Sequence, residues 1–224
     1  MPVQERHLCA VTLLGNLVAK PDIRYRANPV SAIAEITIAT RSKWLDKKTK
    51  QYKEWASFHH VKVEGDLVEQ SLLNADKGDI ILVQGYLSNI IPNKGPAKSG
   101  TANSNACLVH ANFIQKYSKA YTQTINQIFC SAKFTADPQL ITTQNNKKLL
   151  QTSIAINHQT YSMAKQCWQS HKVEQEMQVW GKQAQYLAEH AKAGDAVMVE
   201  GKLSYLTTAD KTQFIEAKSV HLLS

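Results

Sequence analysis

The chain has 224 residues, a length that fits one large domain or two domains of about 110 residues each. Its 43% hydrophobic content is enough for a buried core, and no stretch approaches the roughly 18 consecutive apolar residues of a membrane helix. The net charge of +8 favours a polyanionic partner. Residues 1–7 lack the apolar segment of a secretory signal, so we expect a cytoplasmic protein. The four cysteines are far apart and form no C-x-x-C pair, which argues against a disulfide framework or a zinc ribbon.

Five segments in the first half of the chain predict β-strands. They are rich in β-forming residues and are bounded by Pro, Gly, Asn or Lys clusters, and they cover residues 8–18, 33–40, 58–64, 80–87 and 108–114. Residues 66–75 lie between the third and fourth segments and carry the apolar spacing of a short amphipathic helix. Long connections are predicted at residues 43–53 and 92–105.

The second half of the chain repeats the first at a spacing of 116 residues. Val63-Glu64-Gly65 matches Val179-Trp180-Gly181, and a second glycine, Gly85, matches Gly201. Both of these later glycines are predicted to mark strand bends. The repeat predicts two diverged copies of one domain, at residues 1–118 and 119–224. Five strands with a helix between the third and the fourth is the order of an OB-fold, so the predicted fold class is all-β, with two tandem five-stranded Greek-key barrels.

Enzymatic functions find little support in this sequence. It contains no phosphate-binding loop, dinucleotide fingerprint, nucleophile elbow or H-E-x-x-H motif. His59 and His60 are neighbours on a predicted strand, so their side chains point to opposite faces and cannot chelate one metal together. We therefore expect a protein that is not an enzyme and that needs no cofactor and no metal.

Residues 41–60 combine four aromatic side chains with six cations and two histidines. Single-stranded nucleic acid requires both kinds of side chain, because cations contact the phosphates while flat rings stack on unpaired bases. The alternative is that Trp44 and Trp55 pack at a barrel edge and that the lysines keep an exposed hairpin soluble. The interleaved pattern favours a binding surface.

The first half of the chain resembles the bacterial single-stranded DNA-binding proteins. The motifs that carry the resemblance are Leu13-Leu14-Gly15-Asn16-Leu17, Ile38-Ala39-Thr40 followed by Trp44, Phe58-His59 where the family usually has Trp-His, and Lys77-Gly78 before Val83-Gln84-Gly85. The resemblance implies sequence-tolerant binding of single-stranded DNA in replication, recombination or repair. It also implies a homodimer that presents four OB-folds, since members with one such domain form tetramers. Members commonly end in an acidic tail, whereas this sequence ends at a predicted strand, so we expect no such tail.

Carried over by position, the resemblance implies that Trp44 and Phe58 stack on bases. A further stacking aromatic of the family is replaced by Glu64 in the first copy but is present as Trp180 in the second. For Trp168, in the corresponding hairpin of the second copy, contact with nucleic acid and packing within the protein are equally open. The complete set of expected nucleic-acid contacts is Arg41, Lys43, Trp44, Lys47, Lys48, Lys50, Lys53, Trp55, Phe58, His59, Lys62, Trp180 and Lys182.

Two other functions remain open at this point. The protein could be a primosomal or mobile-element accessory factor in which the second copy serves oligomerisation or partner docking, because residues 159–168 are weakly basic. RNA binding is also open, since OB-folds bind either backbone.

Overall fold

The computed structural model describes residues 7–28, 30–46, 49–89, 107–117, 119, 123–162, 166–206 and 212–223. The chain divides into two compact units. The first, here called the N-terminal barrel, contains Ala10–Tyr86 and Leu108–Gln127, and the second, the C-terminal barrel, contains Ile128–Ser224 together with Met1–Cys9 and Leu87–Cys107. The linker expected at residues 117–121 and the connection expected at residues 92–105 lie largely or wholly outside the described residues.

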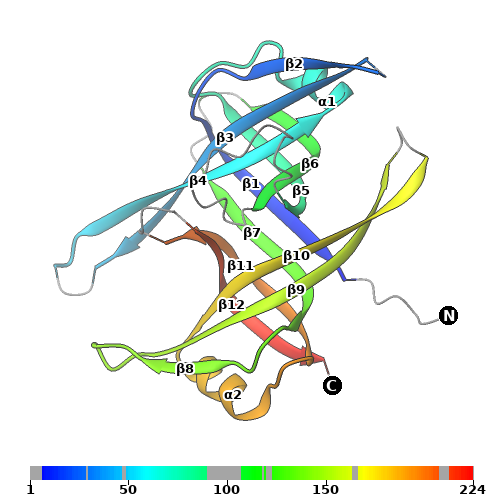
Figure 1. The fold of residues 1–224 in the computed structure, drawn as a ribbon. Helices are drawn as coiled ribbons and strands as arrows, with labels where there is room; N and C mark the ends of the chain where they lie inside the picture. Colours follow the sequence, from blue (N-terminus) through cyan, green and yellow to red (C-terminus); the bar gives the residue numbers. More distant parts are fainter. Residues whose placement is uncertain are drawn as a thin grey trace, which may run out of the picture. The chain divides into compact units, whose positions relative to one another are not determined.

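The first half of the chain forms strands around one short helix (Figure 1). The elements are β1 (Cys9–Leu17), β2 (Asp22–Ala27), β3 (Val30–Leu45), β4 (Tyr52–Glu64), α1 (Asp66–Ser71), β5 (Ile80–Asn89) and β6 (Cys107–Tyr117). The strands are ordered β2-β3-β4-β6-β5-β1, and the additional pairing of β1 with β3 closes the barrel. β4 pairs with β6 in parallel, whereas β1 pairs antiparallel with β3 and β5, and β3 pairs antiparallel with β2 and β4.

Strand alternation places the core of the N-terminal barrel. Buried residues in β3 alternate with more exposed ones from Ala32 to Thr40, and those in β4 alternate from Ser57 to Val63. Successive side chains of a strand point to opposite faces, so one face of each strand packs inside. Helix α1 buries Val68, and the turn that follows it buries Leu72 against the same interior. The barrel is thus filled and leaves its outer strand faces open.

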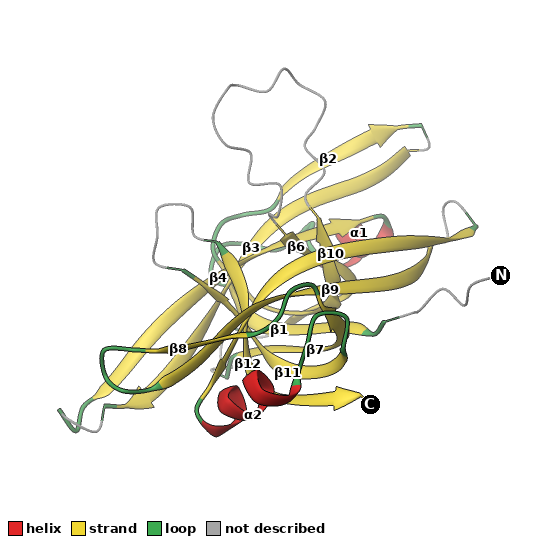
Figure 2. Ribbon diagram, turned by 60° about the horizontal axis from the view of Figure 1, so that its bottom comes forward, coloured by secondary structure: helices red, strands yellow, loops and turns green. Residues whose placement is uncertain are grey.

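The second half of the chain repeats this order. Its elements are β7 (Ile125–Phe134), β8 (Gln139–Thr142), β9 (Lys148–Ser162), β10 (Cys167–Trp180), α2 (Lys182–His190), β11 (Ala196–Tyr205) and β12 (Gln213–Leu223). The strand order is β7-β11-β12-β10-β9-β8, with β7 also pairing with β9, and β10 runs parallel to β12. Figure 2 shows the two helices as short elements among long strands. Both halves therefore have the predicted OB-fold.

Three details differ from the sequence predictions. Residues 43–53 were expected to form a loop, but β3 continues to Leu45 and β4 begins at Tyr52, which leaves a short turn. Strand β2 was not predicted: Ile23, Tyr25 and Ala27 do alternate with charged residues, but the strand has only six residues and almost all of them are exposed. Helix α1 ends at Ser71 rather than at Ala75. The helices in the described residues are too short and too polar to cross a bilayer.

The two glycines predicted at strand bends lie where backbones approach closely. A Cβ on Gly85 would collide with the carbonyl oxygen of His110, and a Cβ on Gly201 would collide with that of Glu216. The pairing of β11 with β12 also shifts register between Glu200 and Gly201. A side chain at Gly85 would push β5 away from β6, and one at Gly201 would push β11 away from β12.

Candidate nucleic-acid interface

The hairpin of β3 and β4 extends beyond the buried part of the N-terminal barrel. Its register runs without interruption from Ile33 opposite Glu64 to Leu45 opposite Tyr52. The buried positions of this ladder end at Thr40 and Ser57, and the described side chains beyond them are exposed or, at Ser42, half-buried. The hairpin therefore projects from the barrel with both faces open to solvent (Figure 1).

Asp46 organises the turn at the tip of this hairpin. Its backbone N–H donates to the carbonyl oxygen of Gln51 at 2.9 Å, and its own carbonyl accepts from the N–H of Lys50 at 2.8 Å. The Asp46 carboxylate accepts from the Thr49 N–H and forms an ion pair with Lys53. Asp46 thus ties the described ends of the turn together, and part of the charge of Lys53 is used in the ion pair. Lys47 and Lys48 lie outside the described residues.

One face of the projecting hairpin, here called the tryptophan face, carries Ser42, Trp44, Lys53 and Trp55. Trp44 lies opposite Lys53 and Trp55 lies opposite Ser42. Residues that are directly opposite in an antiparallel pair share a face, so the two indole rings are diagonal neighbours. Trp44 is 46% exposed and Trp55 is 51% exposed. About half of each side chain is thus available to a ligand.

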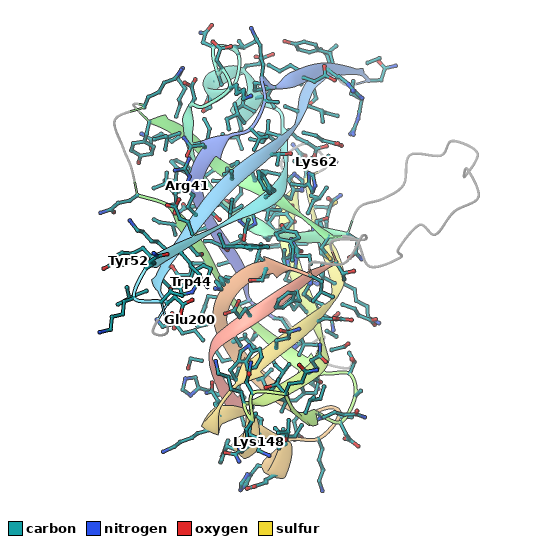
Figure 3. All side chains as sticks on the ribbon, turned by 90° about the vertical axis from the view of Figure 1, so that its left-hand side faces the viewer. Arg41, Trp44, Tyr52, Lys62, Lys148 and Glu200 are labelled. Atoms are coloured by element: carbon teal, nitrogen blue, oxygen red, sulfur yellow. The ribbon has the colours of Figure 1, made fainter. Side chains whose placement is uncertain are left out.

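The opposite side of the hairpin, the outer face, carries a second set of rings and cations. Phe58 is 48% exposed and lies opposite Ala39. The Nζ atom of Lys43 lies 4.9 Å from the centre of the Tyr52 ring, a cation–π distance, and Arg41 shares this face. Figure 3 shows Arg41, Trp44 and Tyr52 along the projecting part, and Lys62 further along the same pair of strands.

Tyr52 was not among the expected contacts, although the sequence carried a signal for it. It is one of the four aromatic residues in the cation-rich run, and its exposure is the largest among the rings of the hairpin. The expected contacts are also divided in a way that the sequence did not reveal. Trp44 and Trp55 lie on one face of the hairpin and Phe58 lies on the other.

His59 was expected to contact nucleic acid, but its side chain is fully buried in the barrel. Its Nε2 atom lies 2.8 Å from the Thr40 hydroxyl. Burial, with a smaller contribution from the charge of His60, lowers the pKa of His59 to about 4. His60 points to the exposed side, so the two histidines do lie on opposite faces. His59 is therefore an uncharged core residue at neutral pH, and nucleic acid bound at the surface does not reach it.

Lys62 lies on the outer face within a cluster centred on Glu64. Its Nζ atom is 2.9 Å from Glu64 Oε1, the Arg26 guanidinium is 3.5 Å from the same oxygen, and His110 Nε2 is 3.4 Å from Glu64 Oε2. The hydrogen bond from His110, followed by that from Lys62, lowers the pKa of Glu64 to about 2 against the opposing effect of burial. The carboxylate is therefore ionised at neutral pH and neutralises Lys62, which the sequence had suggested as a nucleic-acid contact.

The equivalent hairpin of the C-terminal barrel, β9 with β10, carries different chemistry. Its register extends from Leu149 opposite Trp180 to Ser162 opposite Cys167. Trp180 is 42% exposed at the barrel end of this hairpin, and Lys182 is exposed at the start of α2. Between Trp180 and the tip, the same face exposes Glu174 and Glu176.

The tip of this second hairpin carries an aromatic pair. Trp168 lies opposite Tyr161, with ring centroids 5.6 Å apart in an edge-to-face arrangement. Trp168 nevertheless remains 61% exposed. The partner ring was not predicted from sequence, because pairing depends on a register that the weakly patterned residues 159–168 do not define.

This chain resembles a known protein in both sequence and structure. A "Single-stranded DNA-binding protein" from Thermus aquaticus is 26% identical over 211 residues, which cover 88% of this chain and 75% of that protein. The crystal structure of the wild-type Thermus aquaticus protein superimposes with a TM-score of 0.78 over 98% of this chain and 95% of that chain, at 24% identity. A deletion mutant of the same protein has the same TM-score over 98% of this chain and 96% of that chain. These likenesses support the fold of the whole chain.

The family match covers both halves of the chain. Residues 8–112 and 125–222 each match the single-strand binding protein family. Together with the repeated barrels and the projecting hairpin of rings and cations, this match shows that the chain belongs to the single-strand binding protein family.

Proposed function

We propose that this protein binds single-stranded DNA without sequence preference and protects it during replication, recombination or repair. Trp44, Trp55 and Phe58 stack on bases, and Tyr52 adds a fourth ring. Arg41, Lys43 and Lys50 contact phosphates, with Lys53 contributing the part of its charge that Asp46 leaves available.

The observation that carries the proposal is the two-sided hairpin beyond Thr40 and Ser57. A core aromatic is covered by apolar neighbours, whereas Trp44 and Trp55 expose about half of their surface next to cations. Stacking on such rings contributes about 1 to 3 kcal/mol per base and tolerates any base, because every base has a flat face. The surface therefore suits an unpaired strand better than a duplex, whose base faces are covered.

The C-terminal barrel contributes a smaller contact surface in this proposal. Trp180 supplies a stacking ring, and Lys182 supplies a cation at the start of α2. We place the boundary between the two domains at residues 118 and 119. The chain further forms a homodimer with four OB-folds, as the resemblance of its sequence to the family implies.

Fluorescence titration with poly(dT), poly(rU) and duplex DNA at several fixed salt concentrations tests the binding proposal. We expect poly(dT) to bind more tightly than duplex, and the logarithm of the affinity to fall with the logarithm of salt at about 0.7 per phosphate neutralised. Duplex binding as tight as poly(dT) binding would contradict the proposal. Tighter binding of poly(rU) would make RNA the preferred ligand.

Light scattering at micromolar concentration tests the dimer. Twice the chain mass of 25.0 kDa corresponds to a particle of about 50 kDa. A particle with the mass of one chain would show that only two barrels are available to a strand.

A further inference from the structure

The cluster around Glu64 brings three donor side chains of the outer face to one carboxylate. On the outer face of the N-terminal barrel, β2, β3, β4 and β6 lie side by side and bring Arg26, Lys62 and His110 within 3.5 Å of one carboxylate. Three donors that converge from different strands on two oxygens form the arrangement that a phosphate group accepts. In this chain the two oxygens belong to the protein itself.

Several contacts hold this arrangement in place. The Tyr86 hydroxyl lies 2.9 Å from His110 Nδ1, so the His110 ring is contacted at both nitrogens. Glu64 and Lys62 are about 70% covered, whereas Arg26 remains mostly exposed. A carboxylate that is partly buried among cations is much more favourable than the same carboxylate in water, as the lowered pKa of Glu64 also indicates.

We propose that Glu64 occupies a phosphate site formed by Arg26, Lys62 and His110, and thereby excludes the nucleic-acid backbone from this part of the outer face. The inference rests on the proposed function, because it concerns the path of the strand on the same barrel. The bound DNA passes Phe58 and Arg41 toward the hairpin tip and does not continue along β4 to Glu64. Glu64 therefore limits the length of single-stranded DNA that the N-terminal barrel holds.

Substitution of the carboxylate by a neutral amide tests the inference. E64Q retains the size and an acceptor oxygen but removes the charge, so the three donors become available to a phosphate. We expect poly(dT) affinity to rise about threefold to tenfold and the salt dependence to steepen by about 0.7, the value for one added phosphate contact. Titration with dT oligomers of increasing length should show a longer occluded site.

Two further substitutions separate a local site from a general change in charge. Glu35 lies opposite Lys62 in the register and is exposed on the same face, so E35Q removes one negative charge next to the cluster. We expect E35Q to change affinity by less than twofold. K62Q should also have an effect below twofold in the native chain, because Glu64 already neutralises Lys62, but in the E64Q background it should remove the gain.

The outcomes distinguish this inference from the proposed function. If the native protein does not bind poly(dT), the proposed function fails first. If the native protein binds and E64Q matches it in affinity and salt dependence, or if E35Q gives the same gain as E64Q, the phosphate-site inference is wrong. Urea unfolding reports whether E64Q is folded. If it is not, K62Q alone decides, since a loss of more than fivefold would show that Lys62 already contacts DNA.

Discussion

The β3–β4 and β9–β10 hairpins share a backbone plan but differ in what they present to solvent. Each pairs without interruption from its barrel to its tip and alternates buried and exposed residues near the barrel. Beyond the barrel, the first carries rings among cations, whereas the second carries one exposed aromatic pair next to the uncharged Gln166, Cys167 and Gln169. The interior determines which residues a barrel tolerates, while the open face is free to diverge, so a repeated fold does not imply a repeated surface.

Equivalent positions on the outer faces make the contrast specific. Phe58 of the first hairpin corresponds to Glu174 of the second, and His60 corresponds to Glu176. At the barrel end the relation is reversed, because Glu64 corresponds to Trp180. On these faces the first hairpin therefore exposes rings at Tyr52 and Phe58, and the second exposes rings at Trp168 and Trp180.

The largest expected effect concerns the buried position that is His59 in the first hairpin and Gln175 in the second. The pKa of His59 falls from 6.5 to about 4 on folding, so the unfolded chain binds the proton more readily. The stabilisation linked to His59 is fully present above pH 6.5 and is lost as the pH falls toward 4. For a pKa shift of this size, the free energy of unfolding falls by about 3 kcal/mol. Urea unfolding at about pH 7 and about pH 4.5 should show this loss, and His59→Gln should reduce it.

Glu64 and His158 also have lowered pKa values, but their effects on stability can be separated from that of His59. The lowered pKa of Glu64 affects stability only below its ordinary pKa of 4.5, where its stabilising charge is progressively lost. His158, whose pKa burial also lowers, adds a loss of the same sign that His59→Gln leaves in place. Equal pH dependence in the native chain and in His59→Gln would show that His59 is not responsible.

The next effect concerns the tryptophans of the two hairpins. Trp44→Ala should weaken poly(dT) binding by about 1 to 3 kcal/mol, because one stacked base loses its partner. The fold should remain intact, whereas Ile38→Ala, at a fully buried position, should cost about 2 to 5 kcal/mol of stability. Trp168→Ala is the matched variant at the second tip and should weaken binding less. Normal binding by Trp44→Ala together with early melting would identify Trp44 as a structural residue.

An aromatic residue of the first hairpin can be transferred to the equivalent position of the second. Glu174→Phe places the residue of the first hairpin at the equivalent outer position of the second, and should strengthen poly(dT) binding by about 1 kcal/mol through added stacking. Glu174→Gln removes only the negative charge and should produce a smaller gain. If both variants bind equally, charge rather than stacking limits this face, and if neither gains, the face lies away from the strand.

The smallest expected effect concerns single phosphate contacts. Lys43→Gln should reduce the salt dependence of binding by about 0.7, the contribution of one phosphate contact on a single strand. Lys172 is exposed on the second hairpin 3.9 Å from Glu174, so Lys172→Gln is a matched control that should leave the slope nearly unchanged. Equal slopes in the native chain and Lys43→Gln would remove Lys43 from the interface.

The fold was largely predictable from sequence because its signals are local and repeated. Apolar alternation, the helix after Gly65 and the spacing of 116 residues together predicted five strands, a helix and a second copy. The loop predicted at residues 43–53 was wrong because strand pairing there depends on a partner across the hairpin. Exposed lysines and aromatics on both strands lack the one-sided pattern of a half-buried strand.

The amino-acid sequence alone shows which segments carry rings among cations, and which of the two barrels carries them. Which side chains share a face depends on the tertiary structure, because register and pleat separate Trp44 from Phe58 and place His59 inside. It also decided the state of Lys62, whose ion pair with Glu64 forms next to Arg26 and His110 from other strands. Contacts between distant segments depend on how strands pair in space, and side-chain composition does not encode that pairing locally.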